Sequence, residues 1–132
     1  MPEDTPELIC GLHHCAVSAA DYEASARFYT EILGGRMVAA WNIGNRQLCL
    51  IDVGEGSHIE ILGASGDDPQ RPPLAHTALR VTDVDRALER VRAAGYQVTI
   101  EPRDVQLGNS SARIAFCIGP NGEVLEFFQE RS

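Results

Sequence analysis

The sequence lacks the features that place a chain in a membrane or direct it to secretion. No apolar run approaches the roughly 18 residues that a membrane-spanning helix needs. The first ten residues, MPEDTPELIC, are acidic and have neither the basic nor the apolar region of a signal peptide. These absences predict a cytoplasmic protein that has no membrane partner.

Basic residues are scarce, and paired cysteines are absent. The chain of 132 residues has 11 Lys and Arg against 19 Asp and Glu, a formal net charge of −8. This balance argues against nucleic acid partners and anionic membrane surfaces, because both require clustered basic side chains. The cysteines never form a Cys-x-x-Cys pair, so we interpret them as small apolar residues of a reducing compartment: Cys10, Cys15, Cys49 and Cys117.

What the chain does contain is an internal repeat. The segments LHHCAVSAADYEASARFYTEILGG, from Leu12, and LAHTALRVTDVDRALERVRAAGY, from Leu74, both place an Asp seven residues after a His. In each copy the Asp is suited to cap a helix, an apolar stripe of helical period follows, and glycine ends the helix. The stripes are Ala24, Phe28, Ile32 and Leu33 in the first helix, and Val84, Leu88, Val91 and Ala94 in the second.

Three strand-like runs follow each helix: RMVAAWNI, QLCLIDV and SHIEILG, then QVTIEP, ARIAFCIG and EVLEFFQ. The chain is therefore predicted to be one α+β domain (8–130) of two tandem βαβββ modules, 8–63 and 74–130, joined by a linker at 64–73. Two such modules side by side predict an open, cup-shaped, eight-stranded barrel with a cavity. The stretch RDVQLGNSSAR, 103–113, is expected to be a mobile loop bordering the cup.

The last strand of each module carries one glutamate in an apolar frame. The apolar neighbours of Glu60 and Glu126 pack on the helix side, so both carboxylates should point into the cup. A half-buried carboxylate is costly unless it is paired or binds a cation, and His14 and His76 occupy equivalent positions in the first strands. Two histidines and two carboxylates suit one divalent ion, whether Zn, Ni, Co, Fe or Mn.

Two further histidines lie close to these positions in the sequence. His13 is expected to face the other side of the strand from His14, or the rim, because neighbouring residues alternate between faces; we predict a structural role for it. His58 shares the strand face of Glu60, so it is interpreted either as a rim residue or as a hydrogen-bond donor to a metal ligand.

The repeat resembles the vicinal oxygen chelate superfamily, the group of glyoxalases, bleomycin-resistance proteins and extradiol dioxygenases. The second histidine strand, AHTALRVTDVDRAL, and the closing PNGEVLEFFQ share the resemblance, which covers about 8–130. It implies that His14, Glu60, His76 and Glu126 are the ligands of one metal ion per site and that the substrate is a small molecule with vicinal oxygens. With a carboxylate at position 60, the chain is more similar to glyoxalase I than to methylmalonyl-CoA epimerase, which typically has Gln there.

The resemblance implies a lyase or isomerase of the glyoxalase I type, which moves a proton through a metal-bound enediolate. Glu126 would be the base, and Glu60 a ligand and candidate second base. An epimerase-like isomerase and a non-catalytic binding or resistance protein stay open as alternatives. Ser18 and Ala64 replace the Arg and Asn that help glyoxalase I hold glutathione, and MVAAWNIGNRQLCLIDV lacks the extra glutamate of the epimerase.

The same family implies a homodimer. In glyoxalase I each metal site is shared between two subunits, whereas in the epimerase it closes within one chain, and the sequence leaves both arrangements open. Candidate substrate-contacting residues include arginines, which suit carboxylates or phosphates; they are Trp41, Asn42, Arg46, Arg103 and Arg113.

Overall fold

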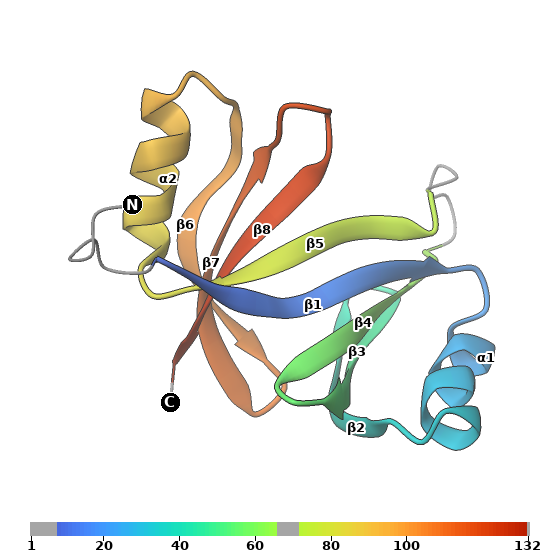
Figure 1. Ribbon diagram of the computed structural model, residues 1–132. Coiled ribbons are helices and arrows are strands. Elements are labelled where there is room, and N and C mark those ends of the chain that lie inside the picture. The colour runs from blue at the N-terminus through green and yellow to red at the C-terminus, as the bar shows by residue number, and fades with distance from the viewer. Residues whose placement is uncertain (1–7, 66–71, 132) are drawn as a thin grey trace.

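The computed structural model describes residues 8–65 and 72–131, which form one curled sheet of eight strands (Figure 1). The acidic residues at 1–7 and most of the predicted linker, 66–71, lie outside the described residues. The first module contains β1 (Ile9–Ala19), α1 (Tyr22–Arg27), the π-helix η1 (Phe28–Ile32), β2 (Arg36–Ile43), β3 (Arg46–Gly54) and β4 (Ser57–Gly63). The second contains β5 (Leu74–Val81), α2 (Val84–Ala93), β6 (Val98–Leu107), β7 (Ser110–Ile118) and β8 (Val124–Arg131).

The two modules join through their first strands. The strand order is β2-β3-β4-β1-β5-β8-β7-β6, with β1 and β5 antiparallel in the middle and β4 and β8 parallel to them on either side. The two helices lie at opposite ends of the molecule, outside the curled sheet (Figure 1). The predicted fold class, two βαβββ modules in an open cup, is confirmed.

Both predicted helix caps are present. The Asp21 carboxylate accepts a hydrogen bond from the Ala24 amide at 3.0 Å, and the Asp83 carboxylate accepts one from the Arg86 amide at 3.1 Å. Such caps satisfy backbone amides that have no partner within the helix. The apolar stripe of α2 packs as expected, because Val84 and Leu88 are buried against the sheet.

The apolar stripe predicted for the first helix is wrong. Phe28 is 46% exposed and Ile32 is 72% exposed, while the opposite side, with Tyr22, Ala26 and Tyr29, packs on the sheet. Small Ala26 allows the helix to approach the sheet, and the Tyr22 hydroxyl donates to the backbone oxygen of Leu48 at 3.3 Å, so tyrosines can fill this side. The helix continues as η1, and the exposed stripe stays on its outer side.

The predicted mobile loop at 103–113 is also wrong. β6 and β7 extend through it and pair in register from Arg103↔Ile114 to Leu107↔Ser110, which leaves a turn of two residues. Val105 and Leu107 are two residues apart and therefore share the inner face of β6, where both pack against a buried cluster that includes Phe128. This packing explains why the segment is a hairpin. Its inner face nevertheless lines the cup, as described below.

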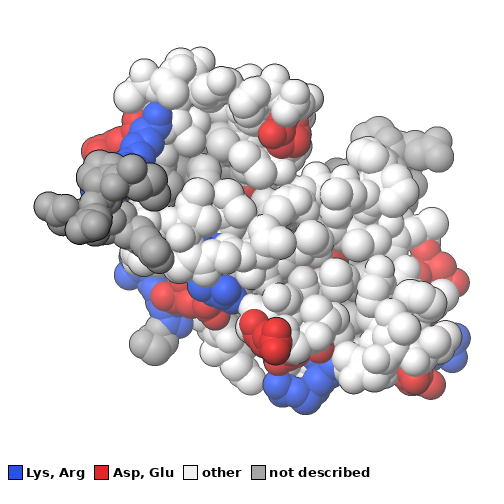
Figure 2. All heavy atoms as spheres, in the orientation of Figure 1, with Lys and Arg blue, Asp and Glu red and all other residues white. Residues whose placement is uncertain are grey.

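The charged side chains are dispersed. On the face shown in Figure 2, the arginines form small separate groups, each beside acidic side chains, and no continuous basic patch appears. Among the described residues, no helix is both long enough and apolar enough to span a bilayer.

Candidate metal centre

Two rows of residues cross the four central strands and bring together the four predicted ligands. In one row Ala16 of β1 lies between Glu60 of β4 and His76 of β5. In the other, Ala78 of β5 lies between His14 of β1 and Glu126 of β8. Both alanines are fully buried. Because an alanine projects only a methyl group, the longer side chains on either side can converge above it.

The four side chains meet within one chain. The Nε2 atom of His14 is 3.3 Å from Glu60 Oε1 and 3.0 Å from Glu126 Oε1. The Nε2 atom of His76 is 3.5 and 3.0 Å from the same two oxygens and 3.3 Å from His14 Nε2. In this structure of a single chain, all four side chains come from the same subunit.

The donor set and its spacing fit a divalent metal ion. Ligand atoms bound at about 2.1 Å to one ion lie roughly 3.0–3.4 Å from their neighbours, close to the distances given above. Donor atoms of His14, His76 and Glu126 lie within 4.8 Å of one another, and Glu60 adds a second carboxylate. Two imidazoles and two carboxylates without thiolate suit borderline first-row metals.

The protonation of the metal-free cluster follows from these contacts. Burial alone would lower the pKa of His14, but its hydrogen bonds with Glu126 and Glu60 outweigh burial and raise the pKa to about 9. The pKa of His76 is raised for the same reasons. Burial would raise the pKa of Glu60, but hydrogen bonds with His14 and His76 lower it to about 2. The two protons thus occupy positions that a divalent cation can take.

His13 does not lie on the far side of the strand, so that prediction is wrong. Between Leu12 and His14, β1 advances two residues while β5 advances one, from Leu79 to Ala78, which makes His13 the extra residue of a β-bulge. The bulge turns the His13 side chain to the inner face, where it is buried, and its Nδ1 lies 2.8 Å from His14 Nδ1. Burial, then the neighbouring His14 and His58, lower the pKa of His13 to about 3.

The four-residue cluster opens into a cavity of about 580 Å³. Three of the residues predicted to contact substrate line it: Trp41 and Asn42 of β2 and Arg103 of β6. The walls also include apolar residues that the sequence analysis did not single out: Ile43, Leu48, Ile100, Val105, Leu107, Ile114, Phe116 and Phe128. Phe128 could have been found, because it lies two residues after Glu126 and therefore shares its strand face.

Arg103 is the cavity's unengaged cation. Its side chain is exposed and lines the cavity, and within residues 8–65 and 72–131 it takes part in no hydrogen bond or ion pair. The other arginines predicted to contact substrate lie outside the lining. Arg46 donates to the backbone oxygen of Gly63 at 2.6 Å, and Arg113 pairs with Asp85 and Asp104.

Two other polar residues near the cluster are placed as follows. The ring of His58 stacks on His13 at 4.6 Å between centroids, and its Nδ1 lies 3.0 Å from the His13 backbone oxygen. It therefore contacts the neighbour of a predicted ligand. The Ser18 hydroxyl is buried and has no hydrogen-bond partner in the part of the chain that the structure describes.

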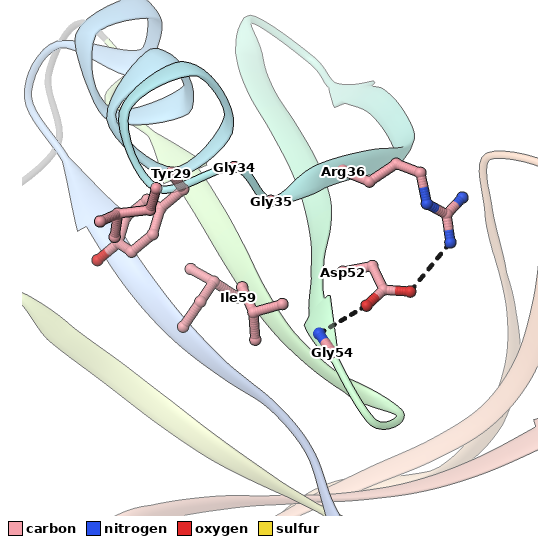
Figure 3. A pocket seen from close by; sticks show the side chains of 9 residues that line it. Tyr29, Gly34, Gly35, Arg36, Asp52, Gly54 and Ile59 are labelled. Atoms are coloured by element: carbon pink, nitrogen blue, oxygen red, sulfur yellow. Dashed lines mark hydrogen bonds and ion pairs between the residues drawn. The ribbon is translucent and has the colours of Figure 1, made fainter.

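A second cavity, of about 630 Å³, lies between η1 and the ends of β2 and β3 (Figure 3). Its two charged lining residues, Arg36 and Asp52, pair with each other at 3.0 Å, and Asp52 also accepts from the Gly54 amide. Tyr29 and Ile59 form an apolar wall opposite them (Figure 3). None of the predicted site residues lines this cavity, so its slightly larger size does not make it the candidate site.

Comparisons with known proteins show which family and which fold the chain resembles. The family model described as the Glyoxalase/Bleomycin resistance protein/Dioxygenase superfamily matches residues 11–127. A lactoylglutathione lyase of Haemophilus influenzae is 30% identical over 126 residues, 90% of this chain and 92% of that protein. A lactoylglutathione lyase of Escherichia coli O157:H7 is 30% identical over 127 residues, 91% of this chain and 93% of that protein.

Among solved structures, a methylmalonyl-CoA epimerase from Mycobacterium tuberculosis superposes with a TM-score of 0.81 at 23% identity. The superposition covers 97% of this chain and 93% of that one. At that identity, the likeness establishes the shared fold alone.

Proposed function

The chain belongs to the Glyoxalase/Bleomycin resistance protein/Dioxygenase superfamily, and from this premise we propose that it is a divalent-metal-dependent lyase or isomerase of the glyoxalase I type. The observation that carries the proposal is the convergence of His14, Glu60, His76 and Glu126 at the base of a cavity. A protein that only binds small molecules would not need two buried carboxylates that converge with two imidazoles, because burying such charged groups is costly even when they are paired.

The proposed reaction removes a proton from a carbon next to a carbonyl and returns it to that carbon or its neighbour. When bound, the metal ion would act as a Lewis acid that stabilises the negative charge formed on the substrate oxygens. Glu126 would take and return the proton, because its buried carboxylate lines the cavity. Glu60 would hold the ion from the other module and is the candidate second base.

Arg103 supports a substrate that carries an anionic group. Among the described residues this guanidinium has no partner, and it can form paired hydrogen bonds to a carboxylate or phosphate in the cavity. Besides the metal-binding cluster and Arg103, the polar lining residues are Asn42, Asp104 and Gln106. Trp41 and Ile100 offer apolar surface beside it. The substrate class that fits is therefore an enolisable carbonyl compound with an anionic end.

An epimerase-like isomerase is the second candidate. The observation that favours it is the assembly of all four predicted ligands within one chain, the arrangement that the epimerase resemblance implies. Against it, the cavity lining has no glutamate besides Glu60 and Glu126 among the described residues, so an additional glutamate base is not available there.

One experiment tests the common core of both candidates. Purified wild-type protein and the Glu126→Gln variant are analysed for metal content and for exchange of substrate C–H with deuterium from heavy water. We expect about one divalent ion per chain in the wild type and a loss of exchange of roughly 10²–10⁴-fold in Glu126→Gln. An Arg113→Gln variant, outside the cavity, is the control and should keep exchange. Absence of bound metal after reconstitution with Ni or Zn would refute the proposal.

The carbon atom that carries deuterium in the product then distinguishes the two candidate reactions. A lyase of the glyoxalase I type moves the proton to the neighbouring carbon, whereas an epimerase returns it to the same carbon. Arg103→Gln should raise KM for an anionic substrate and leave kcat nearly unchanged. Equal KM values for the variant and the wild type would refute the assigned role of Arg103.

A further inference from the structure

The His14 ring has a different partner at each of its two nitrogens. Its Nε2 faces the carboxylates of Glu60 and Glu126. Its Nδ1 lies 2.8 Å from Nδ1 of His13, and both rings are buried. The contact joins the metal-binding cluster to a residue that the proposed reaction does not use.

The direction of this hydrogen bond can be derived from the donor inventory of imidazole. One nitrogen must carry the proton and the other must offer a lone pair. If His14 binds a cation through Nε2, that nitrogen needs its own lone pair, so the proton of the neutral ring must be on Nδ1. His13 Nδ1 is then the acceptor.

We propose that His13 is a positioning residue, which accepts the hydrogen bond from His14 Nδ1–H and thereby fixes the tautomer and ring orientation that direct His14 Nε2 into the centre. This inference rests on the proposed function of the centre. A partner of this kind, on the nitrogen away from a metal, strengthens the histidine as a ligand. Here the partner is a second imidazole instead of a carboxylate or a backbone carbonyl.

Packing holds the His13 ring in one orientation. Its ring stacks on Phe128 at 3.8 Å between centroids and an interplanar angle of 19°, and on His58 at 4.6 Å and 22°. The His13 backbone is held as well, because its carbonyl oxygen lies 3.0 Å from His58 Nδ1. The acceptor is therefore fixed before any metal binds.

The repeat shows that only one of the two histidine ligands has a side-chain hydrogen-bond partner of this kind. Leu12-His13-His14 in β1 corresponds to Leu74-Ala75-His76 in β5, so alanine stands where His13 would be. Ala75 has no side-chain acceptor to offer His76. The two histidines of the centre are therefore not equivalent, and His76 provides an internal control for any measurement on His14.

Two substitutions separate the hydrogen bond from the stacking. His13→Phe keeps a ring between Phe128 and His58 but removes the acceptor. His13→Asn removes the ring but keeps an acceptor, since its Oδ1 is the same number of bonds from the backbone as His Nδ1. The affinity for Co²⁺ is measured by competition with a chelator in the wild type and both variants, with thermal unfolding as the check on folding.

We expect His13→Phe to weaken Co²⁺ binding by about 10–100-fold, and His13→Asn to remain within about threefold of the wild type. Unchanged affinity in His13→Phe would overturn the proposal. Equal weakening in both folded variants would overturn it too, because the ring and not its nitrogen would then matter.

Nitrogen-15 NMR of the histidine side chains in the metal-free wild type is the second measurement, and it depends on neither variant nor metal. We expect a hydrogen-bonded proton on His14 Nδ1, none on His13 Nδ1, and no comparable resonance for His76. A proton on His13 Nδ1 would overturn the proposal. If the wild type bound no divalent ion, the proposed function would fail, while this spectrum would still report on the bond between His13 and His14.

Discussion

Metal binding at this centre should release about two protons near neutral pH. In the metal-free protein, hydrogen bonds to Glu126 and Glu60 overcome the effect of burial and raise the pKa of His14 to about 9, and the pKa of His76 is raised by the same contacts. Because this pKa lies above the solution pH, His14 is predominantly protonated at pH 7. Each Nε2 must lose its proton before it can bind a metal ion.

The size of the pH effect follows from this count. A ligand that displaces one proton gains up to about tenfold in apparent affinity per pH unit below the pKa, so displacement of two protons gives up to about 100-fold. We expect the slope to fall with increasing pH and the affinity to level off above about pH 9, where His14 loses its proton without a metal.

Isothermal titration with Zn²⁺ in buffers of different ionisation enthalpy measures the protons directly, because the observed heat varies linearly with the buffer enthalpy. The His76→Ala variant is the matched control and should release about one proton fewer. Heats that do not depend on the buffer at pH 7 would refute the reasoning, since they would mean that the histidines are neutral before binding or do not bind the ion.

Three further predictions concern stability. The free energy of unfolding of the metal-free protein should be greatest near pH 6.5. The raised pKa of His14 contributes stability that is fully present below pH 6.5 and is lost as the pH rises through about 9. The lowered pKa of His13 makes the stability fall as the pH decreases below 6.5. Thermal unfolding from pH 4 to 10 checks this, and a monotonic profile would contradict it. Ala26→Leu should lower the free energy of unfolding by about 1–3 kcal/mol, because it overpacks the buried side of α1. Phe28→Ser, on the exposed side, should change it by less than about 0.5 kcal/mol. If denaturant titrations gave the reverse order, the apolar stripe predicted from the sequence would be the buried one. Removal of bound divalent ions with a chelator should destabilise the protein by about 2.7 kcal/mol relative to protein at a free metal concentration of 100 Kd, and calorimetric scans showing no change would mean that no ion is bound to the folded state.

The fold was largely predictable because the repeat supplies every signal twice. The caps Asp21 and Asp83 follow local rules that act within a few residues. The positions of Glu60 and Glu126 follow from strand alternation alone, since each has an apolar residue on both sides.

The errors arose where tertiary contacts override a local pattern. The first helix offers two stripes, and counting tyrosines as polar favours the wrong one, because a tyrosine ring can be buried while its hydroxyl finds a backbone oxygen. The hairpin at 103–113 has polar residues on one face, and only the inner face, with Val105 and Leu107, indicates a strand. The bulge at His13 depends on the register between β1 and β5, which are far apart in the sequence.

The repeat and its exceptions therefore have different roles in the proposed chemistry. His14 and His76, like Glu60 and Glu126, occupy equivalent positions, and a metal ion requires only that the two pairs converge. A substrate is not symmetric, so the residues that distinguish its two ends must come from positions where the modules differ. The unengaged Arg103, which lines the cavity, is one such position. His13 against Ala75 is also a difference between the modules, but it acts on the metal ligand His14 and not on the substrate. Substitutions at equivalent positions should therefore alter metal binding, while substitutions such as Arg103→Gln should alter the choice of substrate and leave the ion in place.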